Sequence, residues 1–243
     1  MSIHNEAGTP GVLRRIARFV FSRTTMVFYE YHYNNRDAWR PPQDGSIFRA
    51  LVLPSDHGKL SELLALQRDS EPVFKPIDMQ EAARRLQKGE VCYIGENQGK
   101  IVGYSWFAKQ EKYIPEIEST ICLGPQDLYL YNSYIVKAYR RQNIVGGNIN
   151  AARADLIPQG FTREITATMN WNKAAAGSLM KLNFRVAGTV TAGYFLTLRY
   201  MINGCRDIAF RNETGIFGFY RKLFRKFSTF LRSMGVIKYF QGT

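Results

Sequence analysis

Two stretches decide the fold of this chain: residues 139–147, which read Tyr-Arg-Arg-Gln-Asn-Ile-Val-Gly-Gly, and residues 172–184, which read Asn-Lys-Ala-Ala-Ala-Gly-Ser-Leu-Met-Lys-Leu-Asn-Phe. The first follows an apolar, aromatic run over 128–136 that predicts a strand, and it opens a small-residue segment that predicts a helix. A tight turn into a helix N-terminus presents unpaired backbone N–H groups and the positive end of a helix dipole, which suits a pyrophosphate. The second stretch starts at a strand end and predicts a short helix followed by a new strand.

The first turn resembles a signature of the GCN5-related N-acetyltransferase (GNAT) superfamily, Arg/Gln-x-x-Gly-x-Gly/Ala between a strand and a helix. Arg140 falls on the basic position, while Asn143 and Val145 stand where the family usually has glycines. Asn is the residue other than glycine that best tolerates a positive φ, so we expect Asn143 to replace the first glycine. Gly146 and Gly147 follow at once, and we expect them to allow a close approach of the backbone to the cofactor.

The second stretch is similar to the family's Asn-x-Ala-Ser segment, which ends in Gly-Phe. Asn172 and Phe184 match that segment, whereas Ala175 replaces its Ser and Asn183 replaces its Gly. Upstream, residues 92–104 resemble the central hairpin of the superfamily, with a polar Asn-Gln-Gly turn between alternating strands. Three such pieces in this order are more specific than a lone glycine-containing turn.

The resemblance covers roughly residues 46–200 and implies a GNAT fold of the α/β (α+β) class, in which helices flank a central mixed, mostly antiparallel sheet. Periodicity and breakers predict strands over 46–53, 127–136 and 165–171, a hairpin over 91–108, and two closing strands over 184–210. Helices are expected after Pro54-Ser55-Asp56, from the N-cap Asp78 to Gly89, over 144–157 and over 174–182.

The resemblance also implies a reaction, the direct transfer of an acyl group from a thioester to an amine or hydroxyl without a covalent enzyme intermediate. The co-substrate would be acetyl-CoA or another acyl-CoA, with its pantetheine arm on the strand backbone, its pyrophosphate on the basic turn and an anchor at the Asn. The expected cofactor-binding residues are Ile135, Val136, Arg140, Arg141, Gln142, Asn143, Ile144, Val145, Gly146, Gly147 and Asn172.

The acid and base are harder to place. The family often has a Tyr seven residues after the Asn, where this chain has Leu179, and often a carboxylate on the strand before the turn, where it has Tyr131. We take Tyr131, Asn132 and Glu118 as catalytic candidates, Glu118 because it lies in a polar stretch, 109–126, that would border the acceptor cleft. Core packing of Tyr131 and plain solvation of Glu118 are the alternatives. A catalytically degenerate domain that binds a partner is a further hypothesis, based on Val145, Leu179 and Asn183.

The net charge and the residue composition limit the kinds of partner that the protein can have. The 243-residue chain carries a net charge of +13, which favours anionic partners: an anionic membrane, an acyl carrier protein, or nucleic acid, for which no recognisable module is visible. Three scattered cysteines and three histidines predict free thiols and no metal site. The first residues lack a signal-peptide pattern and no apolar run of about 18 residues occurs, so we expect a cytoplasmic protein.

The termini predict appendages. We expect a basic, aromatic extension over 1–45, the acyltransferase domain over 46–210 and a basic amphipathic helix over 211–243. Such helices suit the inner face of a membrane, which suggests a lipid-linked or glycan-type acceptor, with long-chain acyl transfer from an acyl carrier protein as a variant. An ordinary small-molecule acceptor and a tail packed on the core or on a second subunit remain the alternatives.

Overall fold

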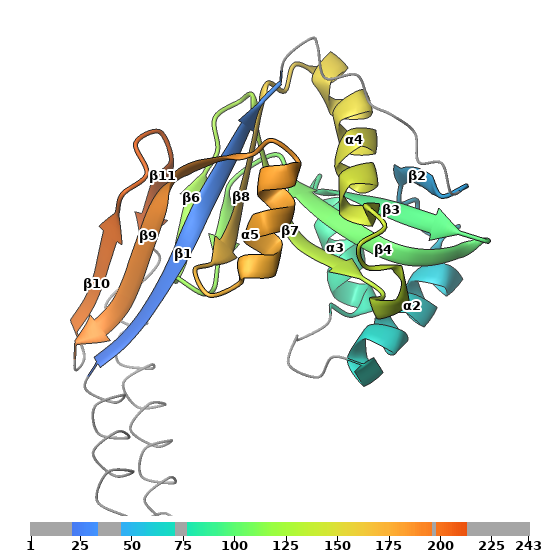
Figure 1. Ribbon diagram of the computed structural model, residues 1–243, viewed down its shortest axis with the longest axis horizontal. Coiled ribbons are helices and arrows are strands. Elements are labelled where there is room, and N and C mark those ends of the chain that lie inside the picture. Colours follow the sequence, from blue (N-terminus) through green and yellow to red (C-terminus); the bar gives the residue numbers. More distant parts are fainter. Residues whose placement is uncertain (1–20, 34–44, 71–76, 196–197, 213–243) are drawn as a thin grey trace, which may run out of the picture.

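The computed structural model describes residues 21–33, 45–70, 77–195 and 198–212, which alternate between strands and helices (Figure 1). The strands are β1 Phe21–His32, β2 Ile47–Ala50, β3 Val91–Asn97, β4 Lys100–Ala108, β5 Lys112–Ile114, β6 Ser119–Cys122, β7 Asp127–Ile135, β8 Arg163–Met169, β9 Arg185–Phe195, β10 Leu198–Asn203 and β11 Ala209–Asn212. The helices are α2 His57–Ser70, α3 Met79–Gln87, α4 Ile144–Leu156 and α5 Lys173–Lys181, with 3-10 turns η1 Lys137–Tyr139 and η2 Ile157–Gln159.

Eight strands form one sheet in the order β10-β9-β1-β8-β7-β4-β3-β2, and β11, β6 and β5 form a second, smaller sheet. All pairings in the large sheet are antiparallel except the one between β7 and β8, which is parallel. The α/β class and the mostly antiparallel sheet flanked by helices, both expected from the sequence, are therefore confirmed.

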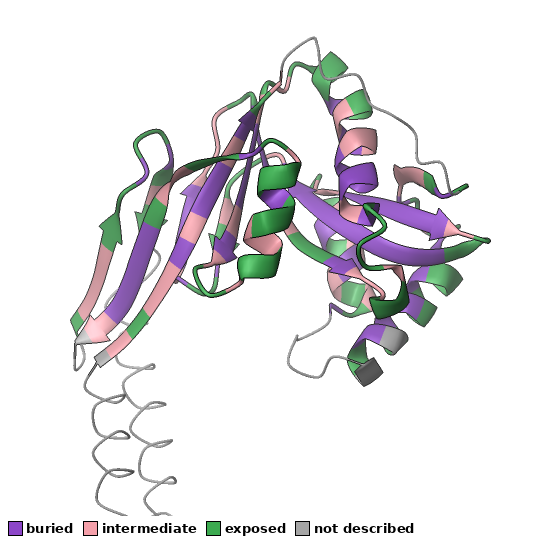
Figure 2. Cartoon of the chain, in the orientation of Figure 1, coloured by how far each residue is buried: buried purple, intermediate pink, exposed green. Residues whose placement is uncertain are grey.

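Helices cover both faces of the sheet because its central strands are apolar on both sides (Figure 2). Neighbouring residues of one strand divide between the faces, as the strand period of two requires. Ile94 and Trp106 pack with α2 and α3, whereas Tyr93 and Phe107 pack with α4 and α5. We call the side of the sheet that α2 and α3 cover the α2/α3 face, and the opposite side the α4/α5 face.

Local sequence signals place several elements correctly. Asp78 caps α3, its carboxylate accepting the Glu81 backbone N–H at 2.7 Å. In the hairpin between β3 and β4, Gln98 and Gly99 have φ values of 50° and 76°, as a tight two-residue turn requires. Two short strands, β5 and β6, lie inside the polar stretch 109–126, for which the sequence predicted no element.

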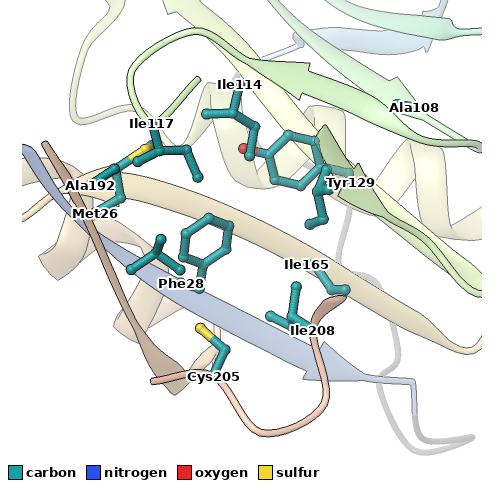
Figure 3. Close-up of a cluster of buried hydrophobic side chains, with 12 residues drawn as sticks. Met26, Phe28, Ala108, Ile114, Ile117, Tyr129, Ile165, Ala192, Cys205 and Ile208 are labelled. Atoms are coloured by element: carbon teal, nitrogen blue, oxygen red, sulfur yellow. The ribbon is translucent and has the colours of Figure 1, made fainter. Parts of the chain in front are cut away.

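The expected boundary at residue 45 is wrong for residues 21–32. These residues form β1, which lies inside the sheet between β8 and β9, so they belong to the core and not to an extension. The side chains of Met26 and Phe28 pack among residues of β5, β7, β8 and β9, and Phe28 is fully buried (Figure 3). The aromatic run that we assigned to an appendage is thus a buried strand. The helix expected over 211–243 is wrong for residues 211–212, which belong to strand β11. The basic segment 12–20 and the rest of that expected helix, 213–243, lie outside the described residues.

A buried ion pair joins α4 to β8, and a ring of β1 packs against its cation. The Arg153 guanidinium of α4 lies 3.8 Å from the ring centre of Tyr31 in β1, and its Nε donates to Glu164 Oε2 at 3.2 Å. Glu164 is fully buried, and this burial raises the pKa of its carboxyl. The N-terminal strand therefore helps to hold the helix that carries the candidate cofactor turn.

Candidate active site

The large sheet opens between β7 and β8. The two parallel strands pair from Asp127 opposite Arg163 to Leu130 opposite Thr166, and the pairing stops there. Beyond this point β7 follows β4, while β8 follows β1 as far as the pair Met26 and Met169. In Figure 1 the two halves of the sheet turn away from each other here, with α5 beside β8. Tyr131 is the first residue of β7 past the last pair, so it lies at the apex of the opening.

A bulge bends β7 immediately after Tyr131. The register between β4 and β7 shifts by one residue between Tyr104 and Trp106, and Asn132 has a φ of 47°. The exposed Asn132 is a catalytic candidate from the sequence, yet the structure gives its backbone a geometric role as the left-handed residue of the bulge. The next residue, Ser133, donates through its hydroxyl to Ser105 at 3.0 Å.

The backbone after the bulge presents Ile135 to the opening. The Val136 N–H donates to Val102 O at 2.9 Å, so Val136 directs its polar groups towards β4. Polar groups alternate along a strand, and those of Ile135 therefore point away from β4, to the side that β8 has left. Of the two backbone positions expected to hold the pantetheine arm, Ile135 faces the opening, whereas the Val136 N–H is occupied within the sheet.

The candidate pyrophosphate turn leads directly into α4. Asn143 is the N-cap residue, with φ 57° and ψ 26°, and its side chain makes no capping hydrogen bond. The left-handed conformation that we expected at this glycine position is therefore confirmed. The first intrahelical donor is the Gly147 N–H, at 2.9 Å from Asn143 O, so the amides of Ile144, Val145 and Gly146 precede the helical hydrogen bonds. These amides face the N-terminal end of α4, where an anion would be stabilised.

Gly146 and Gly147 have packing roles within the protein. A Cβ on Gly146 would come closer than 3.0 Å to the Asn143 side chain, and one on Gly147 would come closer than 3.0 Å to the Phe48 ring of β2. Both glycines are buried, and Gly147 lets α4 lie directly on β2. Their expected role at the cofactor stays a prediction. Val145 packs against the core on the α4/α5 face.

Basic side chains surround the turn. Lys137, Arg140 and Arg141 are exposed, and Arg141 has a φ of 67°. Arg140 Nε donates to Ile135 O at 3.2 Å, and Gln142 Nε2 donates to Ala138 O at 3.2 Å. The cations thus lie beside the uncapped end of α4, where they can bind phosphate oxygens.

Asn172 lies on the other wall of the opening, directly after β8. Its Oδ1 accepts the Ala175 N–H at 3.1 Å, which makes it the N-cap of α5. Its side-chain oxygen therefore serves the helix, and its Nδ2 donors are the groups that can reach a ligand. Trp171, immediately before it, is 67% exposed.

Tyr131 is the centre of a polar cluster on the α2/α3 face. Its hydroxyl donates to Glu90, at the start of β3, and accepts from Lys112 Nζ at 2.8 Å. Lys112 also donates to Glu90 Oε1 at 2.6 Å. Arg85 of α3 lies 5.1 Å from the centre of the Tyr131 ring and 5.2 Å from that of Trp106. Burial lowers the pKa of Lys112 even though Glu90 opposes the shift. The ring of Tyr131 packs partly against the core, yet its hydroxyl lies in a charged environment.

Glu118 lies in a different cluster from Tyr131. Its carboxylate accepts a hydrogen bond from Tyr194 of β9, and Arg199 Nε approaches it at 3.9 Å. Both partners line a hollow of about 240 Å³ beside the β5–β6 turn. At the family's second catalytic position, Leu179 is buried, and Ser178 donates back to Ala174 O at 3.1 Å.

Sequence reasoning missed Glu90, Lys112 and Arg85. They lie 41, 19 and 46 positions from Tyr131 along the chain, on three other elements, and each reads locally as an ordinary surface charge. The pairing of β3 with β4 and of β4 with β7, together with the packing of α3 and β5 beside Tyr131, brings them together. Among the described residues, no His, Cys, Asp and Glu cluster could hold a metal ion. No helix in the described part of the chain is long and apolar enough to cross a membrane.

Taken together, a split between parallel strands, an uncapped helix end with basic residues and a proton-carrying cluster at the apex define an acyl-CoA-dependent acyltransferase. The sequence matches a family model described as acetyltransferase (GNAT) family over residues 60–184, just over half of the chain. The chain therefore belongs to the GNAT acetyltransferase family, whose members are N-acetyltransferases that use acyl-CoA. No curated protein sequence matches the chain.

Solved structures agree with this fold. A GCN5-related N-acetyltransferase from Sphaerobacter thermophilus has a TM-score of 0.51 at 11% identity, and the match covers 83% of this chain and 59% of that protein. An acetyltransferase of the GNAT family from Staphylococcus aureus has a TM-score of 0.44 at 16% identity, with 58% of this chain and 85% of that one covered. The aminoglycoside N-acetyltransferase AAC(6')-Iy, in complex with CoA, has a TM-score of 0.44 at 14% identity, with 57% and 91% covered. Of these three, the Sphaerobacter protein has a TM-score above 0.5, and at 11% identity its likeness concerns the fold alone.

Proposed function

We propose that this protein transfers the acetyl group of acetyl-CoA to a primary amine of a small molecule, at the opening between β7 and β8. The pyrophosphate lies at the N-terminal end of α4, beside Arg140 and Arg141. The pantetheine arm follows the backbone of β7 at Ile135, with Asn172 on the opposite wall. The thioester then lies near Tyr131, at the apex.

The observation that carries this proposal is the position of Tyr131. The cofactor turn belongs to α4, on one face of the sheet, whereas the Tyr131 hydroxyl lies among charged groups on the other face. The donor therefore enters from the α4/α5 face and the acceptor from the α2/α3 face. The two reactants meet where the sheet is open, which supplies the proximity that direct acyl transfer needs.

Beyond holding the two reactants together, the reaction needs a group that takes a proton from the amine. A neutral amine attacks the thioester carbonyl carbon, a C–N bond forms, the C–S bond breaks, and coenzyme A leaves as its thiolate. The Tyr131 oxygen is suited to take the amine proton. A degenerate domain would not need a tyrosine held between a lysine and a carboxylate at this place, so we favour catalysis over mere binding.

The lipid-linked or glycan-type acceptor, the acyl carrier protein and the site at the inner face of a membrane all stay predictions. The acceptor class and the membrane site were based on the basic terminal segments, and residues 12–20 and 213–243 lie outside the described part of the chain. The acyl carrier protein was based on the net charge of the whole chain, which no finding tests further. The small-molecule acceptor is the reading that the described residues support.

The test is release of free thiol from acetyl-CoA in the presence of a panel of amines, amino alcohols and sugars. We expect turnover with at least one amine, and mass spectrometry should show a product heavier by one acetyl group. If coenzyme A binds but no amine or hydroxyl acceptor is acetylated, the proposal fails in favour of the binding module.

A further inference from the structure

We infer that Glu90 works through Tyr131 as the group that takes its proton and returns it, with Lys112 holding the phenol oxygen between them. This inference rests on the proposed function, since it deepens the proton transfer at the same site. It assigns a role to a carboxylate that immediately precedes β3 and is far along the chain from the sequence motifs of the cofactor site.

The geometry forms a closed triangle. The Tyr131 O–H donates to Glu90 Oε2, Lys112 Nζ donates to the Tyr131 oxygen at 2.8 Å, and Lys112 Nζ donates to Glu90 Oε1 at 2.6 Å. The Lys112 and Glu90 side chains are 16% and 11% exposed, so water screens their charges weakly. A phenol that donates to a carboxylate and accepts from an ammonium has one remaining lone pair, which is free to accept the proton of an attacking amine.

The charges around this triangle favour a phenolate-like oxygen during the reaction. Two cations lie against the Tyr131 ring, Arg85 at 5.1 Å and Lys112 at 4.1 Å from its centre. Arg85 is partly neutralised by Glu81, which accepts from its Nε at 2.7 Å. The Arg85 Nη1 and the Trp106 Nε1 beside it are buried without an acceptor. The titratable and charged groups that face Tyr131 from its neighbouring elements are Glu81 and Arg85 of α3, Glu90 before β3 and Lys112 of β5.

The proton balance closes with these groups. As the amine attacks, its proton passes to the Tyr131 oxygen while the Tyr131 proton passes to Glu90. When the C–S bond breaks, the same path runs backwards, and Glu90 returns a proton through Tyr131 to the coenzyme A sulfur. The enzyme ends in its starting protonation state, as an amine and a thioester become an amide and a thiol. Tyr131 touches the reacting atoms, and Glu90 is a positioning residue behind it.

The test compares Glu90→Gln with Glu62→Gln, because the Glu62 carboxylate is 69% exposed and lies 4.0 Å from Lys100. The assay is hydrolysis of acetyl-CoA with no added amine, in which water is the acceptor and the natural acceptor need not be known. We expect Glu90→Gln to lower the rate about 100-fold with coenzyme A affinity unchanged, and Glu62→Gln to leave both unchanged. We also expect the Glu90→Gln rate to rise more steeply with pH, because Tyr131 must then lose its proton to solvent.

A wild-type rate and pH profile in Glu90→Gln overturns the inference. If Glu90→Gln does not fold, Glu90→Asp carries the test: it retains the charge beside Lys112 but withdraws the carboxylate by one methylene, and it should lose rate at neutral pH and regain it at high pH. A flat, wild-type profile in Glu90→Asp also overturns the inference. Failure of the proposed function is distinguishable, because the wild-type protein would then release no thiol from acetyl-CoA with water or with any acceptor, whereas failure of this inference leaves wild-type turnover intact.

Discussion

Three asparagines occupy left-handed backbone positions around the opening. Asn132, Asn143 and Asn183 have φ values of 47°, 57° and 64°. Asn183 ends the segment that resembles Gly-Phe, and Asn143 stands at a glycine position of the turn. Because Asn tolerates this conformation at a small cost, both departures from the family pattern preserve the backbone path. They are therefore weak evidence for a degenerate domain.

At the residue scale, Tyr131→Phe and Asn172→Ala should separate catalysis from cofactor binding. We expect Tyr131→Phe to lower kcat by about 10²-fold or more with an unchanged KM for acetyl-CoA, because it removes the proton and leaves the ring packing. Asn172→Ala should raise the KM for acetyl-CoA and also lower the free energy of unfolding by about 1 kcal/mol through the lost cap of α5. Steady-state kinetics and urea unfolding measure both. A Tyr131→Phe variant with normal kcat would show that Tyr131 only packs.

The sequence predicts the backbone geometry of the turn into α4 well and the polar cluster around Tyr131 poorly. The turn is contiguous in the chain, so its residue types carry the signal at a fixed spacing. Glu90, Lys112 and Tyr131 meet only through strand register, which residue types do not encode locally. Glu118, a carboxylate in the expected polar stretch, pairs with Tyr194 and lies outside the Tyr131 cluster, and its catalytic role stays a prediction.

At the scale of the element, the position of α4 depends on Gly146 and Gly147, because a Cβ at either residue would clash with a neighbouring side chain. Gly147→Ala should lower the free energy of unfolding by about 1–3 kcal/mol and weaken coenzyme A binding, because the new methyl group displaces α4 from Phe48. Phe48→Leu in the same chain should recover part of the loss. The control is Gly177→Ala in α5, where nothing lies within 4 Å, and which should stabilise the protein by about 0.5–1 kcal/mol. Equal effects of both alanines would contradict the packing account.

Helix α3 should give the protein an acid-sensitive contribution to stability. Hydrogen bonds from Arg84, and then from Arg85, lower the pKa of Glu81 from 4.5 to about 2. A depressed folded-state pKa stabilises the protein fully above the unfolded value, and the stabilisation is lost as the pH falls from about 4.5 to about 2. With the partial exposure of the pair, we expect a loss of about 1–2 kcal/mol over this range.

Urea unfolding at pH 6 and pH 3 measures this loss, and Glu81→Gln should show a smaller difference between the two pH values than wild type. Glu62→Gln is the control, because its carboxylate is 69% exposed and lies 4.0 Å from Lys100. If Glu81→Gln keeps the full pH dependence, the α3 pair does not carry it.

For the whole molecule, the position of β1 changes what counts as the domain. The sequence does not reveal this strand, since its aromatic run has no local marker that distinguishes a central strand from an amphipathic appendage. Its partners, β8 and β9, come more than 130 residues later. Pairing over such a distance is set by the completed sheet, so chain order misleads here.

We therefore expect a fragment of residues 46–210 to lack a cooperative unfolding transition, because removal of β1 separates β9 from β8. In the full chain, Phe28→Ala should cost about 3–5 kcal/mol, whereas Leu198→Ala, at a side chain 67% exposed on β10, should cost less than about 0.5 kcal/mol. Urea unfolding followed by circular dichroism measures all three. Cooperative unfolding of the fragment would contradict this account and would show that the domain begins after residue 45.

The central claim, that the turn into α4 and the opening beside it bind an acyl-CoA, is tested most directly by calorimetric titration with coenzyme A and its dephospho form. We predict a sub-millimolar Kd for coenzyme A that weakens with added salt, because the pyrophosphate meets the uncapped amides of α4 and the cations Lys137, Arg140 and Arg141. The dephospho form, which retains the pyrophosphate, should also bind. No heat and no thermal shift with either compound would contradict the account.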